Sequence, residues 1–95
     1  MSANTNPVEV RLFGPLREIV GRRSVTVPYA GMTMKDALAR FAEERGAVIR
    51  HMLLDSQGKR RPSIIFLLND ETVDDEGQQL CSGDVISVLF PLAGG

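Results

Sequence analysis

One segment decides the fold of this chain, TMKDALARFAEERG at residues 33–46. Its apolar side chains recur at the spacing of a single helix face: Met34, Ala37, Leu38, Phe41 and Ala42. Thr33 can cap such a helix, and Asp36, three residues later, completes the pattern of a capping box. Gly46 follows as a terminator. The segment therefore predicts an amphipathic helix that begins at Met34 and rests its apolar face on a sheet.

Strand patterns flank this helix on both sides. Residues 8–13 and 24–28 alternate apolar and polar side chains, which predicts an antiparallel hairpin joined by a long connector at residues 16–21. After the helix, residues 63–69, 69–73 and 85–90 predict an apolar strand, a turn with a short strand, and a last strand. The order is typical of an α+β fold, a mixed sheet of four to five strands with one main helix across it. We expect a β-grasp.

Two stretches leave alternatives open. Residues 48–54 have the spacing of a short second helix, but seven residues do not decide the matter. Residues 64–68 are apolar without a break, which means either burial on both faces of the strand or an exposed apolar face. Between them, residues 55–62 predict a turn and a basic loop.

Length and composition limit the classes of protein. A chain of 95 residues supports one core, and we expect a flexible N-terminus at 1–7, a β-grasp domain at 8–91 and a flexible tail at 92–95. Eleven basic and twelve acidic residues are spread along the chain, so no nucleic-acid partner is expected. No apolar run approaches a membrane span, and the start lacks the pattern of a secretory signal, which favours the cytoplasm and no membrane partner.

The chain lacks the residue clusters that catalysis or metal binding requires. It has one histidine, His51, and one cysteine, Cys81, and no phosphate-binding glycine loop. We expect Cys81 to be a small buried side chain. The pattern favours a carrier or binding protein with no bound cofactor and no metal, rather than an enzyme.

The last residues are Phe90-Pro91-Leu92-Ala93-Gly94-Gly95. Pro91 prevents continuation as an interior strand, and the side chains then shrink to none at Gly94 and Gly95. Such a tail can thread a narrow channel, because glycine has no Cβ and accepts φ of either sign. We expect the Gly95 carboxylate to be the reacting group: it can attack the α-phosphate of ATP, and sulfur can then displace the adenylate to give a thiocarboxylate.

Residues 10–21, VRLFGPLREIVG, and 80–95, LCSGDVISVLFPLAGG, resemble the opening and the ending of the MoaD/ThiS family of ubiquitin-like sulfur carriers. The opening is more similar to the MoaD branch, although Phe90-Pro91 stands where the family usually has two prolines. The resemblance implies adenylylation at Gly95 by a MoeB- or ThiF-like enzyme that uses ATP. It also implies a cysteine desulfurase or rhodanese as sulfur donor, and delivery to molybdopterin synthesis with a MoaE-like large subunit.

The strand pattern also predicts an interface. It places Phe13, Ile65, Leu67, Val85 and Leu89 on the face of the sheet away from the helix. Exposed apolar patches usually bind a partner, although dimerisation or a covering loop is the alternative. The resemblance implies that Phe13 and Leu89 contact the activating enzyme, and we add the tail residues Pro91, Leu92 and Ala93 to the expected interface. Two other readings stay open: a modifier joined to lysines through Gly95, and a structural module whose tail is incidental.

Overall fold

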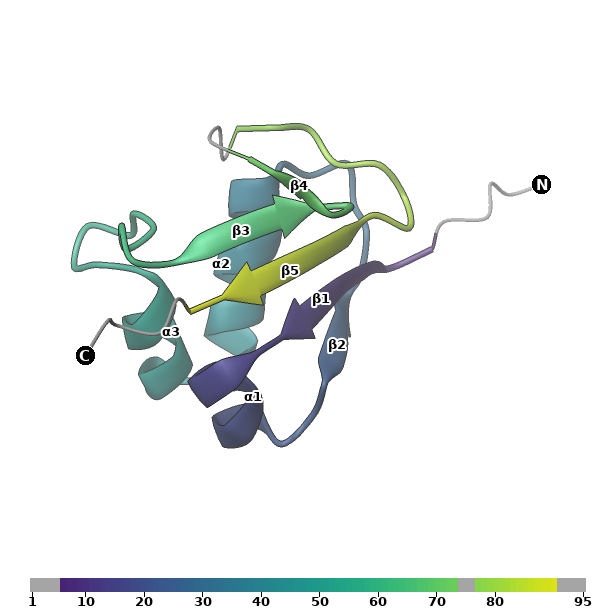
Figure 1. Cartoon of the computed structure of the whole chain (residues 1–95). Helices are drawn as coiled ribbons and strands as arrows, with labels where there is room; N and C mark the ends of the chain where they lie inside the picture. The colour runs from purple at the N-terminus through teal and green to yellow at the C-terminus, as the bar shows by residue number, and fades with distance from the viewer. Residues whose placement is uncertain (1–5, 74–76, 91–95) are drawn as a thin grey trace.

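A five-stranded mixed sheet forms the centre of the computed structural model, which describes residues 6–73 and 77–90. The strands lie in the order β2-β1-β5-β3-β4 (Figure 1). Their bounds are β1 Val8–Leu12, β2 Ser24–Val27, β3 Ile65–Leu68, β4 Glu71–Thr72 and β5 Val85–Leu89. β1 and β5 are parallel and the other neighbours antiparallel. The mixed sheet with a helix across it is the expected β-grasp.

The register of the central strands places one apolar face inward. Val10 lies opposite Val25 on β2 and opposite Ile86 on β5, and all three side chains are buried. Each such side chain stabilises the fold by about 1.5–3 kcal/mol relative to leaving it in water. The predicted hairpin of β1 with β2 and the predicted inward faces are confirmed.

The helix that crosses this face is α2, Met34–Arg45. The Thr33 hydroxyl accepts a hydrogen bond from the Asp36 backbone N–H at 3.2 Å, and the Asp36 carboxylate accepts one from the Thr33 N–H at 3.1 Å. The hydrogen bond that the carboxylate accepts from the Thr33 backbone, followed by that from the Thr33 side chain, lowers the pKa of Asp36 from 3.8. The predicted capping box is present, and the helix ends at Gly46 as expected.

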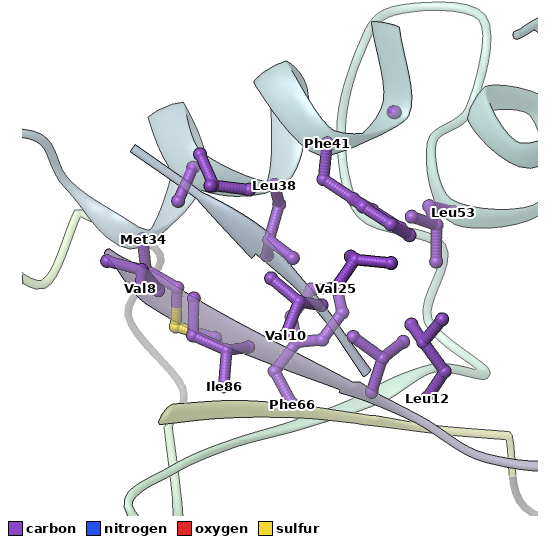
Figure 2. Close-up of a cluster of buried hydrophobic side chains, with 14 of the residues drawn as sticks. Val8, Val10, Leu12, Val25, Met34, Leu38, Phe41, Leu53, Phe66 and Ile86 are labelled. Atoms are coloured by element: carbon purple, nitrogen blue, oxygen red, sulfur yellow. The ribbon is translucent and has the colours of Figure 1, made fainter. Parts of the chain in front are cut away.

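The core lies between α2 and the sheet. Figure 2 shows Met34, Leu38 and Phe41 of α2 directed toward side chains of the strands. Phe41 and Phe66 are the largest fully buried side chains among the described residues. Because the apolar stripe of α2 and the alternating faces of β1, β5 and β3 meet here, sequence pattern and packing agree.

The connector between β1 and β2 differs from the prediction. It contains a seven-residue helix, α1, at Gly14–Val20, with proline in its first turn and Gly21 at its C-terminal cap. Gly21 has a φ of 79°, in the left-handed region that favours glycine, and its N–H donates to the Arg17 carbonyl at 2.8 Å. The physical reason for the helix is Leu16, which it carries into the core and buries completely. The expected loop is therefore wrong over these residues.

The open question at residues 48–54 is answered by a third helix, α3, Ala47–Leu53, which buries Ile49 and Leu53.

The prediction of a buried Cys81 is wrong, because its side chain is exposed. Cys81 instead begins a turn in which its backbone N–H donates to the Asp84 carboxylate at 2.7 Å. A polar turn offers no apolar pocket to a small side chain.

The flexible N-terminus expected at residues 1–7 and the flexible tail expected at 92–95 remain predictions. Within the described part, Asn6 is already fixed, since its N–H donates to the Ser82 hydroxyl at 2.6 Å and its carbonyl accepts from the Gly83 N–H at 3.1 Å. Over residues 6–73 and 77–90, none of the helices has the length and apolarity to cross a bilayer.

Candidate functional site

The face of the sheet opposite α2 carries the predicted interface residues. Figure 1 shows α2 behind the sheet, with the opposite face of β3, β5 and β1 toward the viewer. Ile64 and Phe66 are buried, whereas Ile65 between them is 39% exposed. The continuous apolar run of this strand is thus explained by an exposed apolar face at Ile65 rather than by complete burial.

Three of these residues form a row across one end of the sheet. Ile65 on β3 lies directly opposite Leu89 on β5. Leu12 is paired with Val88, and Phe13 continues the strand with extended dihedrals, so Phe13 lies one step further on, level with Leu89. Phe13 is 40% exposed and Leu89 half-buried. We call Phe13, Leu89 and Ile65 the apolar row.

The other two predicted patch residues lie differently. Leu67 is half-buried beside the row, opposite Ser87. Val85 shares the face but lies at the far end of β5, opposite Glu9, with Ser87 between it and Leu89. Ser87 is buried, although it belongs to the helix-free face. The structure thus groups Phe13, Ile65, Leu67 and Leu89 and separates Val85 from them.

A charged hollow that the sequence did not reveal adjoins Phe13. It measures ≈ 280 Å³, and its lining includes Leu12, Phe13 and the side chains of Arg11, Arg17 and Arg23. Arg11 lies beside Glu9, with 3.2 Å between the guanidinium nitrogen and the carboxylate oxygen. Arg11 could have been placed on this face from the strand alternation. Arg17 could not, because α1 was not predicted.

The described chain ends close to this row. Phe90 follows Leu89, is half-buried and packs against the core. The residues expected to react, Gly94 and Gly95, and the expected contact residues Pro91, Leu92 and Ala93 lie outside the described residues. The structure shows that β5 ends at the edge of the sheet where the apolar row lies, so the chain beyond Phe90 begins beside this row.

The described residues offer little other chemistry. Within 6–73 and 77–90, no three His, Cys, Asp or Glu side chains gather as a metal ion would require. His51 and Cys81 are both exposed, and they belong to separate elements, His51 to α3 and Cys81 to the turn before β5. The arrangement provides a surface and a chain end, rather than a set of converging catalytic groups.

A mixed sheet that holds one long helix, with its central last strand leading to a Gly-Gly sequence, defines a ubiquitin-like protein of the β-grasp class. The ThiS family matches residues 10–95, and the chain belongs to this family of ubiquitin-like sulfur carriers. The family expected from residues 10–21 and 80–95 is confirmed. No curated protein matches the chain in sequence.

Solved structures support the same class. SAMP1 from Haloferax volcanii is 26% identical, with a TM-score of 0.85 over 95% of this chain and 100% of that one. CysO, in the Amycolatopsis orientalis BexX/CysO complex, is similar at 28% identity and a TM-score of 0.73, over 93% and 99% of the two chains. A chain of the complex of subunits 1 and 2 of the molybdopterin-converting factor from Helicobacter pylori 26695 matches at 27% identity and a TM-score of 0.60, over 94% and 99%.

Proposed function

We propose that this protein is a sulfur carrier whose Gly95 carboxylate is adenylylated and then converted to a thiocarboxylate, and that it supplies sulfur for molybdopterin synthesis in the cytoplasm. The observation that carries the proposal is the continuity of the last segment. β5 is fixed in the centre of the sheet, the chain leaves it beside the apolar row, and the family match runs on through Gly94 and Gly95.

The chemistry needs no catalytic group on this chain. A carboxylate oxygen of Gly95 attacks the α-phosphorus of ATP held by a MoeB- or ThiF-like enzyme, and pyrophosphate leaves. The outer sulfur of a persulfide on a cysteine desulfurase or rhodanese then attacks the acyl carbon and displaces AMP, which gives an acyl disulfide. A second thiol cleaves the S–S bond of this acyl disulfide, releases the acyl sulfur and forms a disulfide with the donor's cysteine. The product is a thiocarboxylate. Glycine at both last positions lets the acyl group approach a bound nucleotide without a side-chain clash.

The apolar row explains how such an enzyme would recognise the chain. Phe13, Ile65 and Leu89 expose apolar surface on a rigid sheet, and Leu67 extends it. Burying this surface in a partner would be favourable and would fix the direction in which the chain leaves β5. Pro91, Leu92 and Ala93 would then follow into the partner's channel. The same face would be available to a MoaE-like subunit when the sulfur is delivered.

Deletion of Gly94 and Gly95 tests the proposal. The truncated protein should melt as the intact protein does, because the core formed by the described residues is left complete, but ATP–pyrophosphate exchange with the cognate adenylyltransferase should be lost. A variant with both glycines replaced by alanine is the matched control, since it keeps the length and the terminal carboxylate and should retain part of the exchange. Exchange at the intact rate after the deletion would contradict the carrier proposal.

Intact-mass measurement of the protein purified from its native cell gives a second test. We expect a species that ends at Gly95 with one oxygen replaced by sulfur, and we expect this species to revert to the carboxylate when a MoaE-like subunit and its acceptor are added. If the thiocarboxylate is consumed only by enzymes of thiamine, cysteine or transfer-RNA thiolation, the assignment to molybdopterin is wrong while the carrier function stands.

The likeness to SAMP1, at a TM-score of 0.85, favours a second candidate, a modifier joined to lysines of other proteins through Gly95. Both functions use the same activated carboxyl group and differ in the nucleophile that meets it. After incubation with the activating enzyme, ATP, a sulfur donor and cell extract, a carrier accumulates as thiocarboxylate. A modifier appears instead in larger species that resist reducing agents.

A further inference from the structure

A basic hollow lies between α3 and the loop that precedes β3. Its volume is ≈ 490 Å³. On the α3 side it is lined by Ala47, Arg50 and His51, and on the loop side by Leu54, Ser56 and Arg61. It is separate from the apolar row, and neither the sequence motifs nor the proposed function uses it.

The hollow has walls that are fixed by hydrogen bonds. Leu54 and Arg60 form an antiparallel bridge, and the Arg61 N–H donates to the Leu53 carbonyl at 3.0 Å. The Arg61 side chain also donates from Nε to the His51 carbonyl at 2.6 Å. That bond uses one of the five N–H donors of the guanidinium, so Arg61 is held at the wall with donors left to bind a ligand. The shape is therefore preorganised.

The carboxylate in the lining is already engaged. Asp55 Oδ1 accepts hydrogen bonds from the backbone N–H groups of Lys59 at 3.0 Å and Gln57 at 2.8 Å. These two bonds lower the pKa of Asp55 from 3.8. Asp55 thus closes the turn as an ionised cap whose Oδ1 is occupied by two backbone N–H groups of its own loop.

The remaining charge is positive. Residues 50–61 contain four cations, Arg50, Lys59, Arg60 and Arg61, against the single carboxylate of Asp55, whereas the whole chain has a net charge of −1. Arg50 and Lys59 are exposed, and the Arg60 guanidinium lies 5.5 Å from the centre of the Phe66 ring. Within the lining itself two guanidinium groups, those of Arg50 and Arg61, stand against one carboxylate, and a positive excess in a shaped hollow attracts carboxylates.

The position of the hollow relates it to the chain end. The Ile64 N–H donates to the Arg61 carbonyl at 3.1 Å, and the next residue, Ile65, is paired with Leu89. The loop therefore lies at the end of the sheet where β5 finishes, and in Figure 1 the arrowhead of β5 points toward this loop and α3. A protein that binds the apolar row and receives the chain beyond Phe90 would therefore lie at the same end of the sheet as the hollow.

We propose that this basic hollow docks an acidic segment, rich in Asp and Glu, on the surface of the protein that receives the C-terminal end. The inference rests on the proposed function, since it assumes such a receiving protein. A carboxylate-bearing protein segment fits better than a nucleic acid, because Ala47 and Leu54 supply apolar lining and the cations are few and local. The apolar row would fix the orientation of the chain on the receiving protein, and the hollow would select for an acidic surface beside the end of β5.

Charge reversal tests this docking. The double variant Arg50→Glu with Lys59→Glu leaves Arg61 and its bond to His51 intact. The matched control is Lys35→Glu with Arg40→Glu, two exposed residues of α2 that undergo the same change of charge away from the hollow. Circular dichroism and melting should show both variants folded.

The readout is ATP–pyrophosphate exchange with the cognate adenylyltransferase as a function of carrier concentration. Because docking acts on the ground state and the transition state alike, the test variant should raise KM about tenfold with kcat unchanged, and the increase should shrink at high salt. The control should keep the KM of the unmodified protein. If the unmodified protein supports exchange and the test variant has the same KM, the hollow is not a docking site and the carrier function stands. If the unmodified protein supports no exchange, the proposed function fails and this inference fails with it.

Discussion

Replacing Val88 by Asp should unfold the domain, whereas replacing its neighbour Leu89 by Asp should leave it folded. The two residues are adjacent on β5 but point to opposite faces of the sheet. Val88 lies in the core, fully buried, with Leu12 and Phe66 as its register partners. Leu89 is half-buried in the apolar row, opposite Ile65. The same new charge therefore meets two different environments.

The magnitudes follow from burial. Removing the Val88 side chain forfeits about 1.5–3 kcal/mol of apolar burial. Introducing a carboxyl group without a partner costs at least about 2 kcal/mol more. A loss of about 4 kcal/mol or more compares with a total stability of about 5–14 kcal/mol for a chain of this length. For Leu89→Asp, the side chain stays near water and we expect a loss of about 1 kcal/mol.

Urea denaturation followed by circular dichroism measures both changes. Val88→Asp should be unfolded already in buffer, or have its midpoint lowered by about 2 M or more. Leu89→Asp should show a small shift and yet bind the adenylyltransferase weakly. Thr26→Asp, an exposed substitution on the same face two strands away, should bind normally. If Leu89→Asp is the more destabilising of the pair, the inner and outer faces have been exchanged and the apolar row is core.

Three further predictions concern α2 and the lysines. Thr33→Ala removes the hydroxyl that caps α2 and should lower the free energy of unfolding by about 1 kcal/mol, measured by urea denaturation at neutral pH. The folded-state pKa of Asp36 lies below its unfolded value of 3.8, so the stability that its carboxylate contributes is present above pH 3.8 and is lost as the pH falls through the folded pKa. Asp36→Asn should therefore be less stable than the unmodified protein at neutral pH and equally stable in acid. A difference in stability that persists in acid would contradict the capping role. In a conjugation assay, Lys35→Arg with Lys59→Arg should abolish most linkage of the protein to itself, because these are its two lysines, while thiocarboxylate formation at Gly95 is unchanged.

The parts of the fold that could be predicted are those in which local pattern and packing agree. The apolar face of α2 and its capping box could be predicted, because both depend only on residues a few positions apart in the sequence. The alternation along β1 identified the inward face for the same reason. Helix α1 was missed because seven residues give a weak period, although Pro15 in its first turn and Gly21 at its end mark its limits.

The candidate site could be predicted only in part, because it depends on long-range register. The alternation placed Phe13, Ile65 and Leu89 on one face, but only the pairing of β5 with β1 and β3 shows that these residues form one row across the sheet. The basic loop at residues 55–62 could be predicted, but the hollow that it forms with α3 could not. Its walls come from α3 and from a loop folded back by the bridge of Leu54 with Arg60, and neither short element has a distinctive pattern.

The parallel pairing of β1 with β5 has a consequence for synthesis of the protein. The strands at the centre of the sheet come from opposite ends of the described sequence, so about seventy-five residues must be looped out before Val10 can meet Ile86, and this cost delays folding. While the ribosome has not yet released β5, β1 and β3 each have an unsatisfied edge that aggregation or proteolysis can exploit. Chains interrupted before Leu89 should be cleared by the cell's proteases. The chains that persist are then those in which β5 has completed the sheet.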